Sequence, residues 1–127
     1  MEMTGEIFPE IGNLINLDSL ILKENQFSGI IPPEIGALEN LTELELGGNL
    51  IAGAIPPEIG DLERLTFLHL EYNQFTESIP SEISNLTNLV WLNFVHNQLT
   101  GEIPESICDL NINWTDPNNF NIWILFF

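Results

Sequence analysis

The sequence predicts a solenoid, in which the chain coils repeatedly around one elongated core and each coil carries a short parallel β-strand. Two observations support this fold class. Asparagine recurs at Asn25, Asn49, Asn73 and Asn97, each 24 residues after the last, and the residues between them recur in step. A fixed period of this length is typical of repeat architectures, in which each unit packs mainly against its neighbours.

The repeat defines the expected domain organisation. Four windows align without a gap: residues 14–37, 38–61, 62–85 and 86–109. Leu or Phe fills the first, fourth, seventh and ninth positions, Ile-Pro the eighteenth and nineteenth, and Ile the twenty-second. Residues 4–12 match the second half of a window. We therefore expect a partial N-terminal repeat over 1–13, four complete repeats over 14–109, and a divergent C-terminal cap or truncated tail over 110–127.

This pattern resembles the leucine-rich repeat in its 24-residue plant-type class, which has a Thr-Gly-x-Ile-Pro segment. That class occurs in the ectodomains of receptor-like kinases and receptor-like proteins and in polygalacturonase inhibitors. The match covers about residues 4–110. The resemblance implies a leucine-rich-repeat solenoid of the α/β class horseshoe type, with short parallel β-strands on the concave face and loops or 3-10 turns on the convex face.

The strand in each coil also follows from the residues. Leu68 and Leu70 alternate with polar or aromatic neighbours, which is the period of a half-buried strand. Stacked coils would pair these strands about 4.8 Å apart in a parallel sheet. Its inner face would bury one ladder of large apolar residues: Leu20, Leu22, Leu44, Leu46, Leu68, Leu70, Leu92 and Phe94.

The recurring asparagine suits the corner after each strand. Its side chain both donates and accepts hydrogen bonds, so it can satisfy backbone groups at a buried turn. We therefore expect Asn25, Asn49, Asn73 and Asn97 to form a structural ladder inside the solenoid. Glycine follows in three repeats, where it permits a tight path, but Glu77 stands at that position in the third repeat and leaves the local geometry open.

The net charge of the chain limits the classes of molecule that it is expected to bind. Lys23 and Arg64 are the only lysine and arginine, against 19 acidic residues, and the net charge is -17. This field disfavours nucleic acid and anionic membrane surfaces and favours basic proteins, basic peptides or divalent cations.

The two ends indicate a fragment of a longer protein. Met1 to Thr4 do not form a signal peptide and lead directly into a repeat. The apolar run from Ile122 to Phe127 is much shorter than the roughly 20 residues that span a bilayer, so we favour a cap strand or a sequence artefact over a membrane anchor. Membrane contact is expected only through regions missing from this chain. The resemblance implies an extracellular or cell-surface location, and a cytoplasmic one stays open.

Function is expected on the outward positions of the strands, which the scaffold does not use. These positions change along the solenoid from acidic in the second repeat to aromatic in the third and fourth. Exposed aromatic residues with a polar rim are typical of protein interfaces. The predicted partner-binding residues are Glu43, Glu45, Phe67, His69, Glu71, Tyr72, Trp91, Asn93, Val95 and His96.

No enzyme is predicted. His69 and Glu71 would project from one strand and Asn93 and His96 from the next, which makes a metal site conceivable, but no ligand-spacing motif supports it. Neither a nucleophile with a paired base nor a phosphate loop is visible. We therefore expect no catalytic residue, no metal and no cofactor.

The leading functional hypothesis is a monomeric, non-enzymatic module that binds a protein or peptide on its concave face, and the negative charge favours a basic partner. One alternative is an enzyme-inhibitor module like the polygalacturonase inhibitors. Another is a structural or ice-binding repeat protein, although the mixed residues of the concave ladders weigh against ice binding.

Two features stay open at the level of sequence. Three glycosylation motifs begin at Asn40, Asn85 and Asn113, and the first two also follow from the repeat pattern. Cys108 is the only cysteine. It is either a small residue in a tight slot or, as the resemblance allows, half of a cap disulfide whose partner lies outside this chain.

Overall fold

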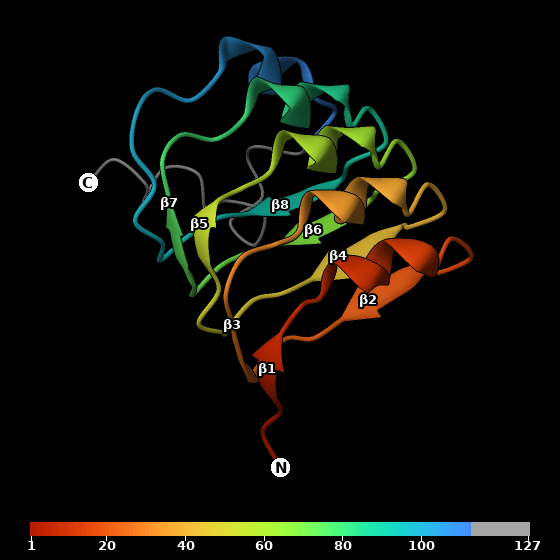
Figure 1. The fold of residues 1–127 in the computed structure, drawn as a ribbon. Coiled ribbons are helices and arrows are strands. Elements are labelled where there is room, and N and C mark those ends of the chain that lie inside the picture. The colour runs from red at the N-terminus through yellow and green to blue at the C-terminus, as the bar shows by residue number, and fades with distance from the viewer. Residues whose placement is uncertain (113–127) are drawn as a thin grey trace.

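The structure is a computed structural model that describes residues 1–112, and these residues form a solenoid (Figure 1). A concave sheet lies on one side and a row of short 3-10 helices on the other. The strands are β1 (Thr4–Glu6), β2 (Ser19–Ile21), β3 (Gln26–Ser28), β4 (Glu43–Glu45), β5 (Ala52–Ala54), β6 (Phe67–His69), β7 (Gln74–Thr76) and β8 (Trp91–Asn93). The 3-10 helices are η1 (Pro9–Asn13), η2 (Pro33–Ala37), η3 (Pro57–Asp61), η4 (Ser81–Asn85) and η5 (Glu105–Asp109).

The concave sheet has the strand order β2-β4-β6-β8, and every pairing is parallel. Its register follows the repeat, since Leu20 pairs with Leu44, Leu44 with Leu68, and Leu68 with Leu92. Equivalent residues therefore lie side by side in neighbouring coils. The predicted fold class, with parallel strands on the concave face and 3-10 turns on the convex face, is confirmed.

A second ladder of parallel strands follows the asparagine corner, and the sequence analysis did not anticipate it. Strand β1 pairs with β3, and β5 pairs with β7. Backbone hydrogen bonds from Leu50 N to Phe27 O and from Ala52 N to Gly29 O join these two pairs. Because these segments contain few regularly alternating apolar residues, their pattern alone does not distinguish them from loops.

The 3-10 helices begin where the recurring Ile-Pro ends an extended segment. Pro32, Pro56 and Pro80 have extended backbone angles and directly precede η2, η3 and η4. Proline fixes φ near the value that a helix start needs and offers no N–H that would require a partner. The repeat therefore sets both the start and the spacing of the convex helices.

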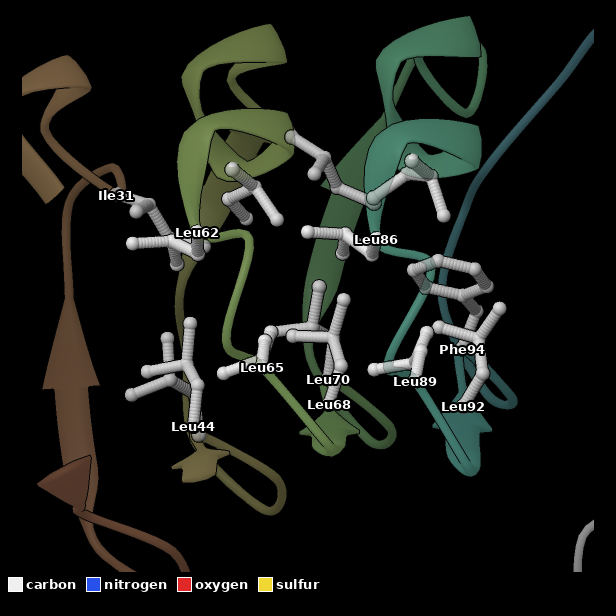
Figure 2. Packing of buried hydrophobic residues seen from close by; sticks show 14 of the residues in the cluster. Ile31, Leu44, Leu62, Leu65, Leu68, Leu70, Leu86, Leu89, Leu92 and Phe94 are labelled. Carbon is white, nitrogen blue, oxygen red and sulfur yellow. The ribbon is translucent and has the colours of Figure 1, made fainter. Parts of the chain in front are cut away.

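The core is one continuous apolar cluster between the concave sheet and the 3-10 helices (Figure 2). Leu44, Leu68 and Leu92 are fully buried on the inner face of adjacent strands, and Phe75 and Phe94 are the largest fully buried side chains among the described residues. The predicted inner face is buried in the second, third and fourth repeats. At the N-terminal end Leu20 is 9% exposed and Leu22 only partly buried.

The four recurring asparagines make hydrogen bonds within and between coils. Asn73 is the example: its Oδ1 accepts from Ile51 N at 3.0 Å, and its Nδ2 donates to Leu46 O at 2.9 Å and Leu70 O at 3.3 Å. Asn49 and Asn97 make the equivalent bonds. One amide thus satisfies backbone groups of two coils at a corner where the sheet ends.

Glu77 adopts the same backbone conformation as the glycines that it replaces. Its φ is 63°, against 77° at Gly53 and 79° at Gly101. A side chain in this left-handed region is strained by about 1–2 kcal/mol. A Cβ at Gly53 would be 2.9 Å from Ile30 Cγ2, whereas the residue that stands 23 positions before Glu77, as Ile30 does before Gly53, is Ala54, which has no atom beyond Cβ. The repeat geometry overrides the preference of the single residue.

Candidate functional site

The concave surface is formed by the outward side chains of β4, β6 and β8 and by the residues that follow these strands. Phe67 is 38% and Tyr72 54% exposed, and His96 is also exposed. Glu43, His69, Glu71 and Trp91 are half-buried. Three further predicted site residues are buried: Glu45, Asn93 and Val95. A partner could therefore reach fewer residues than the sequence analysis predicted for the binding site.

Two stacked pairs of rings organise the aromatic part of this surface. The rings of His69 and Trp91 are 5.7 Å apart and nearly parallel, with an interplanar angle of 8°. Those of Tyr72 and His96 are 4.4 Å apart at 17°. Each pair joins a residue of the third repeat to one of the fourth, because adjacent strands are in register. Phe67 pairs with Trp91 along the same sheet and completes the cluster.

The Tyr72 and His96 pair depends on an unusual backbone. Tyr72 has φ 53° and His96 φ 55°, and Glu24 and Gly48 occupy the same left-handed position in the first two repeats. Non-glycine residues adopt this conformation at a cost. Here the corner that leads into the asparagine ladder imposes it, so the scaffold presents an outward side chain after β2, β6 and β8, whereas Gly48 leaves that position bare after β4.

Glu71 lies against the backbone of the preceding coil at Gly47. A Cβ on Gly47 would be 2.6 Å from Glu71 Oε1 and 2.8 Å from its Cδ, so any larger residue there would require this carboxylate to move. Oε1 is 3.6 Å from His69 Nδ1. Oε2 is buried and has no hydrogen-bond partner among the described residues. A buried carboxylate oxygen without a partner is costly and can accept a donor from a bound molecule.

One lysine, Lys23, lies beside the acidic part of the surface and pairs with one of its carboxylates. Lys23 Nζ is 2.5 Å from Glu45 Oε2. Burial of Glu45 acts to raise its pKa, but the hydrogen bond and the charge of Lys23 outweigh burial and hold the pKa below its ordinary value. The same hydrogen bond and charge raise the pKa of Lys23. Lys23 therefore neutralises Glu45 and leaves the charges of Glu43 and Glu71 unpaired by any lysine or arginine within residues 1–112.

Glu43 and Asn93 are each held by local hydrogen bonds. Ser19 Oγ donates to Glu43 Oε2 at 2.9 Å, across the β2–β4 pair. Asn93 Oδ1 accepts from Val95 N at 3.1 Å, so this side chain shapes the chain after β8. Trp91 Nε1 is buried and lacks a hydrogen-bond partner within the described part of the chain.

The described part of the chain contains neither a cluster of metal-ligand side chains nor a helix that could span a membrane. Residues 1–112 contain no group of three or more His, Cys, Asp or Glu side chains placed to hold a metal ion. No helix in that range is long and apolar enough to cross a bilayer. Cys108 is an exposed free thiol in η5. The motif at Asn113 and the apolar run from Ile122 to Phe127 lie outside the described residues.

The chain belongs to the leucine-rich repeat family. The family model, described as Leucine Rich Repeat, matches four segments: residues 16–38, 40–62, 64–86 and 88–110. These matches cover most of the chain and agree with its period. No curated protein sequence matches the chain significantly.

Solved structures of plant proteins are similar in both fold and sequence. The Arabidopsis receptor kinase HAESA, in complex with the peptide hormone IDA and the co-receptor SERK1, aligns with a TM-score of 0.85 and 36% identity over 88% of this chain and 19% of its own. The ectodomain of the Arabidopsis thaliana receptor kinase GASSHO1/SCHENGEN3, in complex with CASPARIAN STRIP INTEGRITY FACTOR 2, gives 0.82 and 42% over 84% of this chain and 13% of its own. This chain thus spans less than a fifth of either receptor chain.

A third similar structure is that of a protein with a different binding function. A plant ice-binding protein aligns with a TM-score of 0.78 and 38% identity, over 82% of this chain and 34% of its own. The fold is therefore shared by proteins with different binding functions, and function has to be argued from the surface.

Sequence reasoning missed two features of the site. Glu45, Asn93 and Val95 occupy outward positions of the repeat yet are buried, because exposure also depends on neighbouring side chains. The role of Gly47 was also missed: it leaves open the space beside its backbone that the Glu71 carboxylate occupies. The only sequence signal for this contact is that Gly47 stands at the repeat position that Lys23 fills in the first repeat and Glu71 in the third.

Proposed function

We propose that this chain is a non-enzymatic recognition module that binds an extended peptide or a protein segment with basic residues on its concave surface. The observation that supports this most is the combination of an exposed aromatic cluster with the unpartnered carboxylate oxygen of Glu71. Aromatic anchors supply apolar contact, and a desolvated carboxylate favours a guanidinium or ammonium group.

Similarity to peptide-binding receptor ectodomains supports the same function. HAESA is in complex with a peptide hormone, and GASSHO1/SCHENGEN3 with an integrity factor. By this likeness we infer that the chain acts outside the cell or at the cell surface, as part of a receptor-like or secreted protein. The net charge of -17 disfavours self-association, so we infer that the module is monomeric.

Peptide selection from a random display library tests the proposal without a known partner. We expect the purified chain to select peptides with lysine or arginine near an apolar residue. Truncating Phe67, Tyr72 and Trp91 together to alanine should raise the Kd of those peptides at least about 30-fold, since aromatic anchors contribute about 2 kcal/mol or more.

The matched control replaces Leu50 and Val90 with alanine, because both are exposed apolar residues outside the aromatic cluster. This control should bind as the parent does, and thermal melts by circular dichroism should show that both variants are folded. Selected peptides that bind the aromatic variant normally would refute the concave surface as the binding site.

Adsorption to ice is a second candidate function, favoured by the 38% identity to a plant ice-binding protein. One repeat position, in or beside the second strand ladder, carries mostly small hydroxyl-bearing residues: Thr4, Ser28, Ala52, Thr76 and Thr100. They are not directly paired in the ladder, where Thr76 lies opposite Ala54. Thermal hysteresis that is lost in a Thr76→Tyr variant would support this candidate, and absence of hysteresis in the parent would remove it.

A further inference from the structure

We propose that Asn85 is an N-glycan acceptor when the chain passes through a secretory route, and that Asn40, which has the same Asn-Leu-Thr motif, is not. The sequence does not distinguish these two motifs, because Asn40-Leu41-Thr42 and Asn85-Leu86-Thr87 have the same residues. They lie at different repeat positions. The structure separates them by what their side chains bind.

The motif at Asn40 is part of the scaffold. Asn40 Nδ2, the atom to which a glycan is attached, donates to Ile15 O at 2.9 Å, and Oδ1 accepts from Arg64 Nη1 at 3.0 Å. Thr42, whose hydroxyl belongs to the motif, is half-buried and donates from Oγ1 to Asp18 O at 2.9 Å. Glycosylation requires an asparagine amide and a threonine hydroxyl that the enzyme can reach. Both groups of this motif are already bound.

A residue outside any motif shows that the bond of Asn40 belongs to the repeat. Asn88 lies 48 residues after Asn40, at the same repeat position, and its Nδ2 donates to Glu63 O at 2.8 Å. This is the counterpart of the bond from Asn40 to Ile15 O. Asparagine at this position therefore ties the start of one coil to the coil before it.

The motif at Asn85 is free of such bonds. Asn85 is the last residue of η4 and is exposed, and its side-chain amide has no hydrogen-bond partner within residues 1–112. Thr87 is exposed as well, and its hydroxyl has no partner in the same range. Gly60, Asp61, Glu63 and Ser84 line an open depression beside both residues, together with Asn88. A sugar on Asn85 would displace no bond seen in this structure.

The order of synthesis strengthens this difference. Asn40 and Thr42 bind Ile15 and Asp18, which precede them in the chain. In a repeat protein a coil packs mainly on its neighbours, so these bonds can form before the later repeats are made. Asn85 has no bond of this kind to an earlier residue. Because it lies on the convex side with η4, a glycan there would also leave the concave surface free.

Site-resolved glycopeptide mass spectrometry tests the inference directly. The 127-residue chain, with an added cleavable signal peptide, is secreted from insect cells and digested with a protease that cuts after acidic residues, because lysine and arginine are too few. We expect glycan on most copies at Asn85 and on few at Asn40. Each motif, including Asn113, is read from its own peptide. Occupancy at Asn40 equal to that at Asn85, or an unmodified Asn85, would overturn the proposal.

A second measurement tests the cause, using chain made in bacteria without glycans. Asn40→Gln should lower the melting temperature, and Asn88→Gln should lower it similarly, since both lose an equivalent bond. Asn85→Gln should leave it unchanged. A loss of stability in Asn85→Gln as large as that in Asn40→Gln would show that Asn85 also serves the scaffold, and would contradict the inference.

Discussion

The first and second coils have almost the same sequence pattern but differ in how well they are buried. In the second coil (residues 38–61), Leu38, Leu41, Leu44 and Leu46 are all fully buried. In the first coil (residues 14–37), the equivalent Leu14 is 52% exposed, Leu17 and Leu22 are partly buried, and Leu20 is 9% exposed. The second coil has a complete coil on each side, whereas the first packs on one complete coil and a partial one. The core is therefore shared between coils instead of belonging to any one of them.

The asparagine corner shows the same difference in polar contacts. Asn49 Nδ2 donates both to Leu46 O in its own coil and to Leu22 O in the coil before it. Asn25 Nδ2 donates only within its own coil, to Leu22 O and Lys23 O. Asn25 is still joined to the partial coil before it, because its Oδ1 accepts from Met3 N at 2.8 Å. Both asparagines therefore link coils, but only Asn49 also donates to a carbonyl of the preceding coil.

The largest effect expected from this comparison is in the apolar core. Leu38→Ala removes a fully buried side chain and should lower the free energy of unfolding by about 2–5 kcal/mol. Leu14→Ala, the matched change one repeat earlier, should cost about 1 kcal/mol or less, because half of that side chain already contacts water. Urea denaturation followed by circular dichroism measures both. Similar losses at the two positions would refute the claim that neighbouring coils create the core.

The asparagine ladder should show a smaller difference of the same sign. Asn49→Ala leaves the N–H of Phe27 and the carbonyls of Leu22 and Leu46 without this partner, and should cost about 2–3 kcal/mol. Asn25→Ala should cost roughly half as much, because Asn25 is more exposed and water can replace its bonds. The same denaturation experiment compares them. A larger loss for Asn25→Ala would mean that the ladder does not act between coils.

Much of this fold follows from the sequence because the repeat fixes register as well as composition. Leu20, Leu44, Leu68 and Leu92 share one repeat position, and their strands pair at that position. The second strand ladder did not follow, because β5 is Ala-Gly-Ala and has no apolar alternation. The pairing of β5 depends on where the preceding asparagine corner places its backbone. Likewise, the left-handed backbone of Glu77 is set by the repeat and not by the residue.

The candidate site was harder to predict than the fold. The sequence indicated which residues occupy outward strand positions, and it predicted a binding cluster of Phe67, Tyr72 and Trp91. It did not indicate that Glu45, Asn93 and Val95 are buried, since burial depends on the packing of side chains from neighbouring coils. Nor did it show the stacking of Tyr72 on His96, which depends on the left-handed corner. Whether these residues bind a partner stays a prediction.

The smallest expected effect is in the ion pair that joins the first coil to the second. Lys23→Met removes the cation beside Glu45 while keeping an apolar stem, and should lower stability near neutral pH by about 1 kcal/mol or less, as Lys23 is largely exposed. Because the folded state holds the pKa of Glu45 below its ordinary value, the pair stabilises the fold above that ordinary value and loses this effect as the pH falls through the lowered pKa.

On the basic side, the raised pKa of Lys23 keeps the pair intact up to the ordinary lysine value and weakens it as the pH rises through the raised one. The parent and Lys23→Met should therefore differ in melting temperature near neutral pH and converge in acid, while a Lys23→Arg control stays close to the parent throughout. A difference that persists unchanged in acid would assign the effect to packing of the lysine stem. The first coil would then be joined to the second by apolar contacts and the asparagine corner, with no contribution from charge.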